Sequence, residues 1–131
     1  MRMLLTKAAI GGLAIATVST AAIADQRLEQ VRVEASRIVT TDAGKTFAGF
    51  PVKNINLSYE VSLDDLDLMT SDGVSTAEKR INNAAAAACK EIGTKAPDST
   101  PADAQCAKTT ARKPLAQLHQ AIAAAKTGSA K

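Results

Sequence analysis

The sequence has few aromatic residues and no tryptophan. Among its 131 residues, Tyr59 is the only tyrosine, and Phe47 and Phe50 are the only phenylalanines. Proteins that bind single-stranded nucleic acid stack bases on such rings, so this composition argues against a nucleic-acid partner. The apolar content is carried by alanine, valine, isoleucine and leucine instead. A core built from these side chains in so short a chain is thin, and a covalent cross-link would strengthen it.

Histidine and cysteine are also scarce. His119 is the only histidine, and Cys89 and Cys106 are the only cysteines. A zinc site uses four ligands, and redox exchangers often use a Cys-x-x-Cys pair, whereas 17 positions separate these two cysteines. We therefore expect a structural disulfide between them, with a pair of free thiols as the alternative. We expect His119 at the boundary of a buried helical stripe, and we assign no catalytic, cofactor-binding or metal-binding residues.

A long hydrophobic run occurs only near the N-terminus. Two basic residues precede an uncharged stretch at 8–18, and small residues follow, ending in Ala22-Ile23-Ala24. This order predicts a signal peptide at 1–24, cleaved after Ala24. The uncharged run is shorter than the roughly 20 apolar residues of a membrane span, and the cleavage point lacks the cysteine of a lipoprotein. We therefore expect a periplasmic or secreted protein with no membrane insertion after cleavage.

The charge is nearly balanced once the predicted signal is set aside. The formal net charge of the whole chain is +3, and removal of Arg2 and Lys7 leaves 14 basic and 13 acidic residues. The segment 60–72 holds five acidic residues and no basic ones. We interpret it as a solvated turn near a helix N-terminus, where negative charge contributes about 0.3–1 kcal/mol per group. We expect its three leucines to turn inward on one helical turn, while the acids face water or accept hydrogen bonds from free backbone donors. A partner-binding face and a calcium site are the alternatives, although the acids do not follow the EF-hand pattern.

Two segments have the alternation of β-strands. Val31–Ser36 alternates and is followed by the β-branched Ile38 and Val39, while 40–51 is rich in glycine and ends in proline, which predicts a loop with room for a short strand at 46–48. In the segment 54–61, one face holds Ile55, Leu57, Tyr59 and Val61, and the other holds Asn54, Asn56, Ser58 and Glu60. One buried face and one solvent-exposed face are typical of an antiparallel sheet that helices cover on one side.

The remaining residues predict helices. Ser75-Thr76-Ala77-Glu78 fits a capping box, with Thr70 or Ser71 as a possible cap of an earlier turn. Apolar residues then recur at helical spacing up to Gly93, which we expect just beyond the helix end: Val74, Ala77, Ile81, Ala84 or Ala85, Ala88 and Ile92.

A second helix is expected from Thr100-Pro101-Ala102-Asp103, with Pro101 at its first position. Pro114 leaves open whether this is one kinked helix or two short ones, and Leu115, Leu118, Ile122 and Ala125 restore an apolar stripe. The last five residues, 127–131, should fray.

The order of these motifs resembles the UrcA family of small exported bacterial proteins. The matching pieces are Tyr59-Glu60-Val61-Ser62-Leu63-Asp64-Asp65-Leu66-Asp67-Leu68, then Gly73, Lys79-Arg80-Ile81, Ala85 to Cys89, and Cys106. The resemblance spans roughly 54–126. It implies a bacterial source, and the family brings no established biochemical activity and no catalytic residues.

These observations predict an α+β domain at 25–131, with an N-terminal strand and loop at 25–51 and a core at 52–126. Two or three antiparallel strands should pack on a helical hairpin that the disulfide clamps. The function that we expect is that of a non-enzymatic envelope protein, a binding or structural module with a possible protein partner. The alternative is an inhibitor or accessory subunit of an envelope enzyme.

Overall fold

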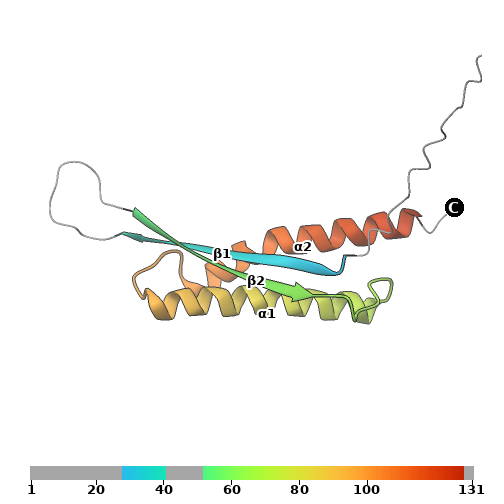
Figure 1. The fold of residues 1–131 in the computed structure, drawn as a ribbon, viewed down its shortest axis with the longest axis horizontal. Coiled ribbons are helices and arrows are strands. Elements are labelled where there is room, and N and C mark those ends of the chain that lie inside the picture. Colours follow the sequence, from blue (N-terminus) through green and yellow to red (C-terminus); the bar gives the residue numbers. More distant parts are fainter. Residues whose placement is uncertain (1–27, 41–51, 129–131) are drawn as a thin grey trace, which may run out of the picture.

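The computed structural model describes residues 28–40 and 52–128. These residues form β1 (Gln30–Thr40), β2 (Val52–Ser62), α1 (Ser71–Lys95) and α2 (Asp103–Gly128), in that order (Figure 1). The predicted signal peptide at 1–24, most of the predicted loop at 40–51 and the short strand within it lie outside the described residues.

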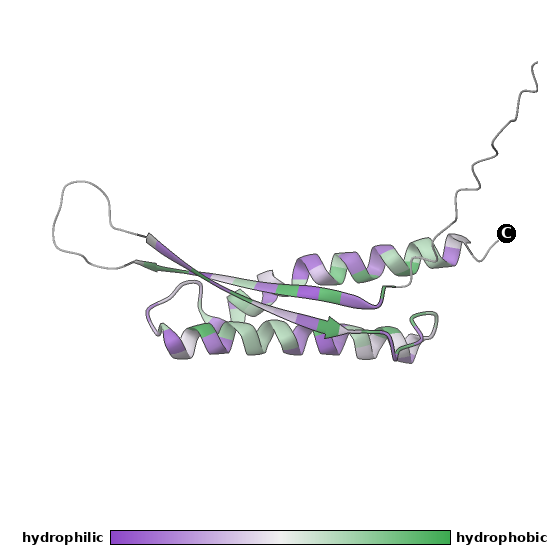
Figure 2. Cartoon of the chain, in the orientation of Figure 1, coloured by the Kyte–Doolittle hydropathy of each residue, from purple (hydrophilic) through white to green (hydrophobic). Residues whose placement is uncertain are grey.

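The two strands pair antiparallel without a bulge, in one register from Gln30 opposite Ser62 to Thr40 opposite Val52. The sheet has two strands among the described residues. Figure 2 shows the hydrophobic and hydrophilic bands that alternate along them. The side chains that face the helices include Val31, Val33 and Ala35, all buried, whereas Arg32, Glu34 and Ser36 between them are exposed. The predicted strands and their two faces are thus confirmed.

The helices form a second layer beneath the sheet. α1 contacts both strands and α2, whereas α2 contacts α1 and β1 but not β2. Ala77, Ala85 and Ala88 on the inner face of α1 are fully buried, because their short side chains let strands and helix approach closely. The structure is therefore α+β, with an antiparallel sheet packed on two helices, as predicted.

α1 begins earlier than the predicted capping box. Thr70 is its N-cap, and the Thr70 Oγ1 accepts a hydrogen bond from the Gly73 N–H at 3.1 Å. A Cβ atom on Gly73 would lie 1.9 Å from the Asp67 carbonyl oxygen, so this position needs glycine for the chain to turn into the helix. The capping box at 75–78 was wrong, and the alternative cap at Thr70 is confirmed.

α1 also ends later than predicted. The helix continues through Gly93 to Lys95, and its C-cap Ala96 donates its backbone N–H to the Ile92 carbonyl. Gly93 was expected just past the end. The reason for a glycine there is instead the close approach of two side chains from other elements, Arg37 and Asp103.

α2 begins at Asp103, so the prediction of Pro101 as its first residue was wrong. The backbone of Thr100 is tied to Ile38 of β1 by two hydrogen bonds of 2.8 Å, which holds the chain extended immediately before Pro101. The Cys106 N–H then donates to the Ala102 carbonyl at 2.9 Å and opens the helix.

Pro114 lies inside one continuous helix, which settles the choice between one helix and two. Its ring is fully buried, so it packs in the core although its nitrogen cannot donate to the carbonyl four residues earlier. Figure 1 shows the first turns of α2 at an angle to the rest, as proline commonly causes. Thr127 and Gly128, expected to fray, belong to α2, and 129–131 lie outside the described residues.

Candidate functional site

The two cysteines form a disulfide that joins α1 to α2. Cys89 and Cys106 have their Cα atoms 5.8 Å apart and their sulfur atoms bonded, and both residues are buried. The Thr110 hydroxyl lies 3.6 Å from the Cys89 sulfur. The predicted disulfide is thus present, and its burial among Ala35, Ala88 and Ile92 fits a structural cross-link.

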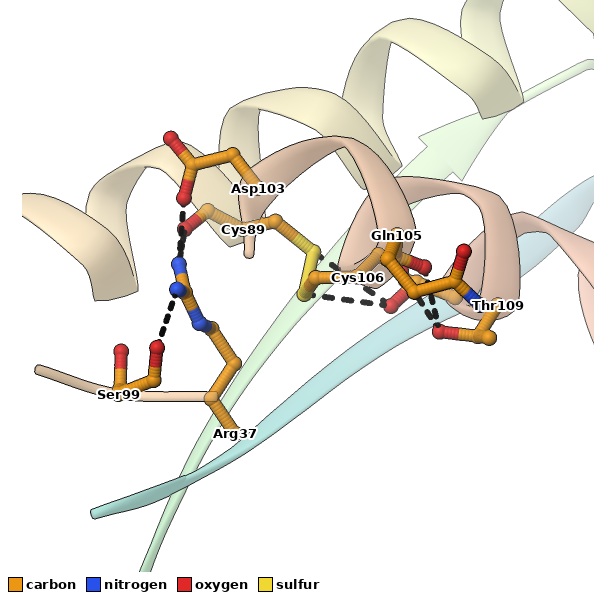
Figure 3. Close-up of a disulfide and its surroundings, with 8 residues drawn as sticks. Arg37, Cys89, Ser99, Asp103, Gln105, Cys106 and Thr109 are labelled. Carbon is orange, nitrogen blue, oxygen red and sulfur yellow. Dashed lines mark hydrogen bonds and ion pairs between the residues drawn. A yellow bond between two sulfur atoms is a disulfide. The ribbon is translucent and has the colours of Figure 1, made fainter. Parts of the chain in front are cut away.

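A buried arginine lies beside this bridge. Arg37 is 3% exposed; its Nη1 donates to the Asp103 carboxylate at 2.5 Å and to the Cys89 carbonyl at 3.1 Å, and its Nη2 donates to the Ser99 carbonyl at 2.6 Å (Figure 3). One side chain of β1 therefore ties together the end of α1, the connecting loop and the start of α2. Because Nη1 and Nη2 already have partners within the chain, we interpret Arg37 as structural.

Arg37 was not singled out from the sequence, although a signal was present. It continues the every-second-residue series Val31, Val33, Ala35 on the face that the helices cover. A charged residue at a buried strand position needs partners, and those partners come from elements up to 66 positions away.

Arg80 of α1 binds the acidic segment 60–72, a contact that the sequence did not predict. Both carboxylate oxygens of Asp65 accept hydrogen bonds of 2.6 Å from Arg80, and the Arg80 Nη1 also donates to the Ser62 carbonyl at 3.0 Å. Hydrogen bonding to Arg80 lowers the pKa of Asp65 below its ordinary value. Asp67 accepts the Met69 N–H at 2.9 Å, which confirms for this residue the predicted role of accepting a free backbone donor.

The leucines between these acids turn inward as predicted. Leu63 is 1% exposed, and Leu66 and Leu68 are partly buried against the same core. They line a pocket of about 510 Å³ together with Met69 and, from α2, Ala121, Ile122 and Ala125. The segment forms two successive turns, in which the Leu66 N–H donates to the Leu63 carbonyl and the Thr70 N–H to the Asp67 carbonyl, rather than the single helical turn expected.

Two glutamates of α1, Glu78 and Glu91, make further polar contacts. The exposed His119 has its Nε2 2.8 Å from the Glu78 carboxylate, which confirms its expected place at the surface or boundary. The Tyr59 hydroxyl donates to Glu91 at 2.5 Å, and Lys95 donates to the same carboxylate. The hydrogen bond to Glu91 raises the pKa of Tyr59, and those from Lys95 and Tyr59 lower the pKa of Glu91.

One edge of the sheet, the outer edge of β2, carries outward-pointing backbone groups. Ile38 uses its outward N–H and C=O to bond Thr100, so Ile38 and its partner Asn54 form a pair that is not hydrogen-bonded across the sheet. By alternation, the N–H and C=O groups of Asn54, Asn56, Ser58 and Glu60 all point away from β1. We call these groups the open edge of β2.

Nothing in the described part of the chain engages the open edge. No hydrogen bond among residues 28–40 and 52–128 reaches the backbone of its four residues. The edge also lacks two of the usual protective devices, since β2 runs for 11 residues with no bulge and no internal proline. Such an edge can accept another strand by backbone hydrogen bonding.

A strip of apolar side chains lies beneath this edge. Ile55, Leu57 and Tyr59 pack on the cluster around the disulfide but are only partly buried, whereas Val31, Val33 and Ala35 of β1 are at most 2% exposed. The difference arises because β1 lies over both helices and β2 over α1 alone. We call these three residues the apolar strip.

The described part of the chain contains no group of three or more side chains suited to hold a metal ion. None of its helices is long and apolar enough to cross a membrane.

Comparisons with protein-family models, with curated proteins and with solved structures gave no match to this chain.

Proposed function

We propose that this chain is an exported, non-enzymatic binding module of the bacterial envelope, periplasmic or secreted, with the open edge of β2 as its binding surface. The observation that carries the proposal is the combination of the outward backbone groups of Asn54, Asn56, Ser58 and Glu60, which no described residue engages, with the partly exposed apolar strip directly beneath them. A strand added there would gain backbone hydrogen bonds and would bury apolar surface in the same step.

The disulfide supports the export part of the proposal. Structural disulfides form and persist in oxidising compartments and are rare in the bacterial cytosol. The Cys89–Cys106 bridge is buried and joins the only two helices among the described residues, so a compartment in which it can form stabilises the fold. The N-terminal signal pattern and the resemblance to the UrcA family agree with this location.

The location is tested by mass analysis of the chain produced with its own N-terminal segment in a bacterial host. We expect the periplasmic or secreted fraction to contain protein that begins at Asp25 and has lost the two hydrogen atoms that a disulfide removes. Retention of residues 1–24, or two free thiols in the exported protein, would overturn the export assignment.

Binding at the edge is tested by photo-crosslinking in the same cells. A photoreactive amino acid replaces Asn56 on the open edge or, as a control, Lys90 on the exposed side of α1. We expect a discrete crosslinked protein product at position 56 only, and we expect Ser58→Pro to abolish it. Equal crosslinking at both positions, or none at either, would overturn a binding function of this edge.

The alternative, an inhibitor or accessory subunit of an envelope enzyme, uses the same surface with a different occupant. The identity of the protein crosslinked at position 56 separates the two, because an accessory subunit must crosslink to an enzyme and change its rate.

A further inference from the structure

We infer that the open edge of β2 binds the same edge of a second copy of this chain, so that two two-stranded sheets join into one four-stranded antiparallel sheet. This inference rests on the proposed function and names its partner. It depends on self-complementarity, because a two-fold interface brings the same surface of both copies together.

The sequence of β2 meets this requirement when the two-fold axis passes at Leu57. Antiparallel pairing then places Asn54 opposite Glu60 and Asn56 opposite Ser58 on the polar face, so that no two like charges oppose each other. These four residues are the ones whose N–H and C=O groups point outward, so both copies present donors and acceptors in matching positions.

The opposite face of the joined sheet supplies the apolar contact. Ile55 lies opposite Tyr59 of the second copy, and Leu57 lies opposite its own equivalent. These side chains are partly exposed, and their burial in the dimer extends the core that α1 covers only from one side. Exposed hydrophobic strips beside an open strand edge favour association.

The helices leave room for this arrangement. α1 contacts both strands, so it lies beneath the middle of the sheet, and neighbouring strands are about 4.8 Å apart. The two copies of α1 would then lie about 10 Å apart, a normal distance for packed helices. Glu91, the acidic residue of α1 that contacts β2, is already paired with Lys95 and brings no uncompensated charge.

The outer edge of β1 is the weaker candidate. Its end at Ile38 is already bonded to Thr100, and its helix-facing side chains Val31, Val33 and Ala35 are already buried. A strand added to β1 would therefore gain fewer backbone hydrogen bonds and almost no apolar burial from this strand.

The experiment measures the mass of the exported chain, with its disulfide intact, by analytical ultracentrifugation over a concentration series. The test variant is Ser58→Pro, which removes an outward N–H and leaves the bonds to β1 in place. Its matched control is Glu34→Pro, because Glu34 lies directly opposite Ser58 in the register and its N–H points outward from the other edge of the sheet. Thermal melts report whether each variant folds.

We expect the unmodified chain and Glu34→Pro to dimerise. Ser58→Pro should raise the dissociation constant at least about tenfold, because each of the two copies loses a hydrogen bond and gains a steric block. Leu57→Lys, at a side chain that is already partly exposed, places two like charges at the two-fold axis and should also raise the dissociation constant of the dimer. This variant tests the dimer if Ser58→Pro does not fold.

Amide hydrogen exchange gives an independent readout. In the dimer we expect slow exchange at Asn54, Asn56, Ser58 and Glu60, and fast exchange at Arg32, Glu34 and Ser36 on the outer edge of β1.

A chain that stays monomeric at every concentration would overturn the self-association. A dimer that persists in Ser58→Pro or Leu57→Lys would also overturn it, and so would a dimer that is lost only in Glu34→Pro. A monomer whose position 56 still crosslinks to another protein in cells would overturn the second copy as occupant while the proposed binding function stands. A monomer without such crosslinks would overturn both.

Discussion

The guanidinium of Arg37 lies against Gly93 of α1. A Cβ atom on Gly93 would lie 2.7 Å from Arg37 Nη1 and 2.6 Å from the carboxylate oxygen of Asp103. The glycine therefore leaves the space through which a buried cation on β1 reaches an acid at the start of α2. This contact, the disulfide next to it and the bonds to Ser99 hold the two helices and the sheet in one arrangement, on which the geometry of the β2 edge depends.

Gly93→Ala should destabilise the protein by about 1–2 kcal/mol, although alanine is the better helix former by about 1 kcal/mol. The added methyl group displaces the exposed Asp103 carboxylate from the buried Arg37. Urea denaturation measures the effect, with Gly128→Ala as the control, since nothing lies within 4 Å of a Cβ atom there. The double variant with Asp103→Ala should lose less than the sum of the two single changes, and a more stable Gly93→Ala protein would contradict this account.

Loss of the Cys89–Cys106 disulfide should cost about 3 kcal/mol, because the bridge closes a loop with a sequence separation of 17 and restricts the unfolded chain. Thermal melts of the oxidised protein, the reduced protein and the Cys89→Ala/Cys106→Ala variant measure it. The chain has no other cysteine, so a reductant has no second target. Identical melting temperatures for all three forms would contradict a stabilising role.

Leu63→Ala should cost about 2–5 kcal/mol, since this side chain is 1% exposed in the core. Leu66→Ala should cost less, about 1–2 kcal/mol, because Leu66 is only partly buried beside the pocket. Chemical denaturation of both variants measures the order, and a larger loss for Leu66 would contradict the observed burial.

Asp65→Asn should lower the melting temperature at neutral pH, and the difference from the unmodified protein should close as the pH falls below 3.8, the ordinary pKa of the group. The hydrogen bonds from Arg80 lower the pKa of Asp65 in the folded state, so the ion pair stabilises the fold above the unfolded pKa and is lost as the carboxylate takes up a proton. Melts across pH 2–7 measure this.

The control for this pH series is Asp98→Asn, at an exposed acid with no ion pair among the described residues. It should show little difference at any pH. A constant gap for Asp65→Asn down to the lowest pH would show that the effect does not come from ionisation.

By itself, the sequence determined those features that follow from short-range periodicity. The two-residue alternation predicted both strands and the faces that they bury, and the helical spacing of Ala77, Ile81, Ala88 and Ile92 predicted the inner face of α1. The disulfide also followed, because the chain has only two cysteines to pair. These patterns are local and depend little on where distant segments lie.

Tertiary structure decided the positions at which residues far apart in the sequence meet. The ends of α1 and α2 differ from the predicted ones because Gly73, Gly93 and Thr100 fit against chain segments that local signals do not report. The partners of Arg37 and Asp65 lie 15 to 66 positions away in the sequence, so no local sequence pattern predicts these contacts. The partial exposure of the apolar strip has the same origin: α2 packs under β1 and not under β2, and only the packed arrangement of all four elements determines that.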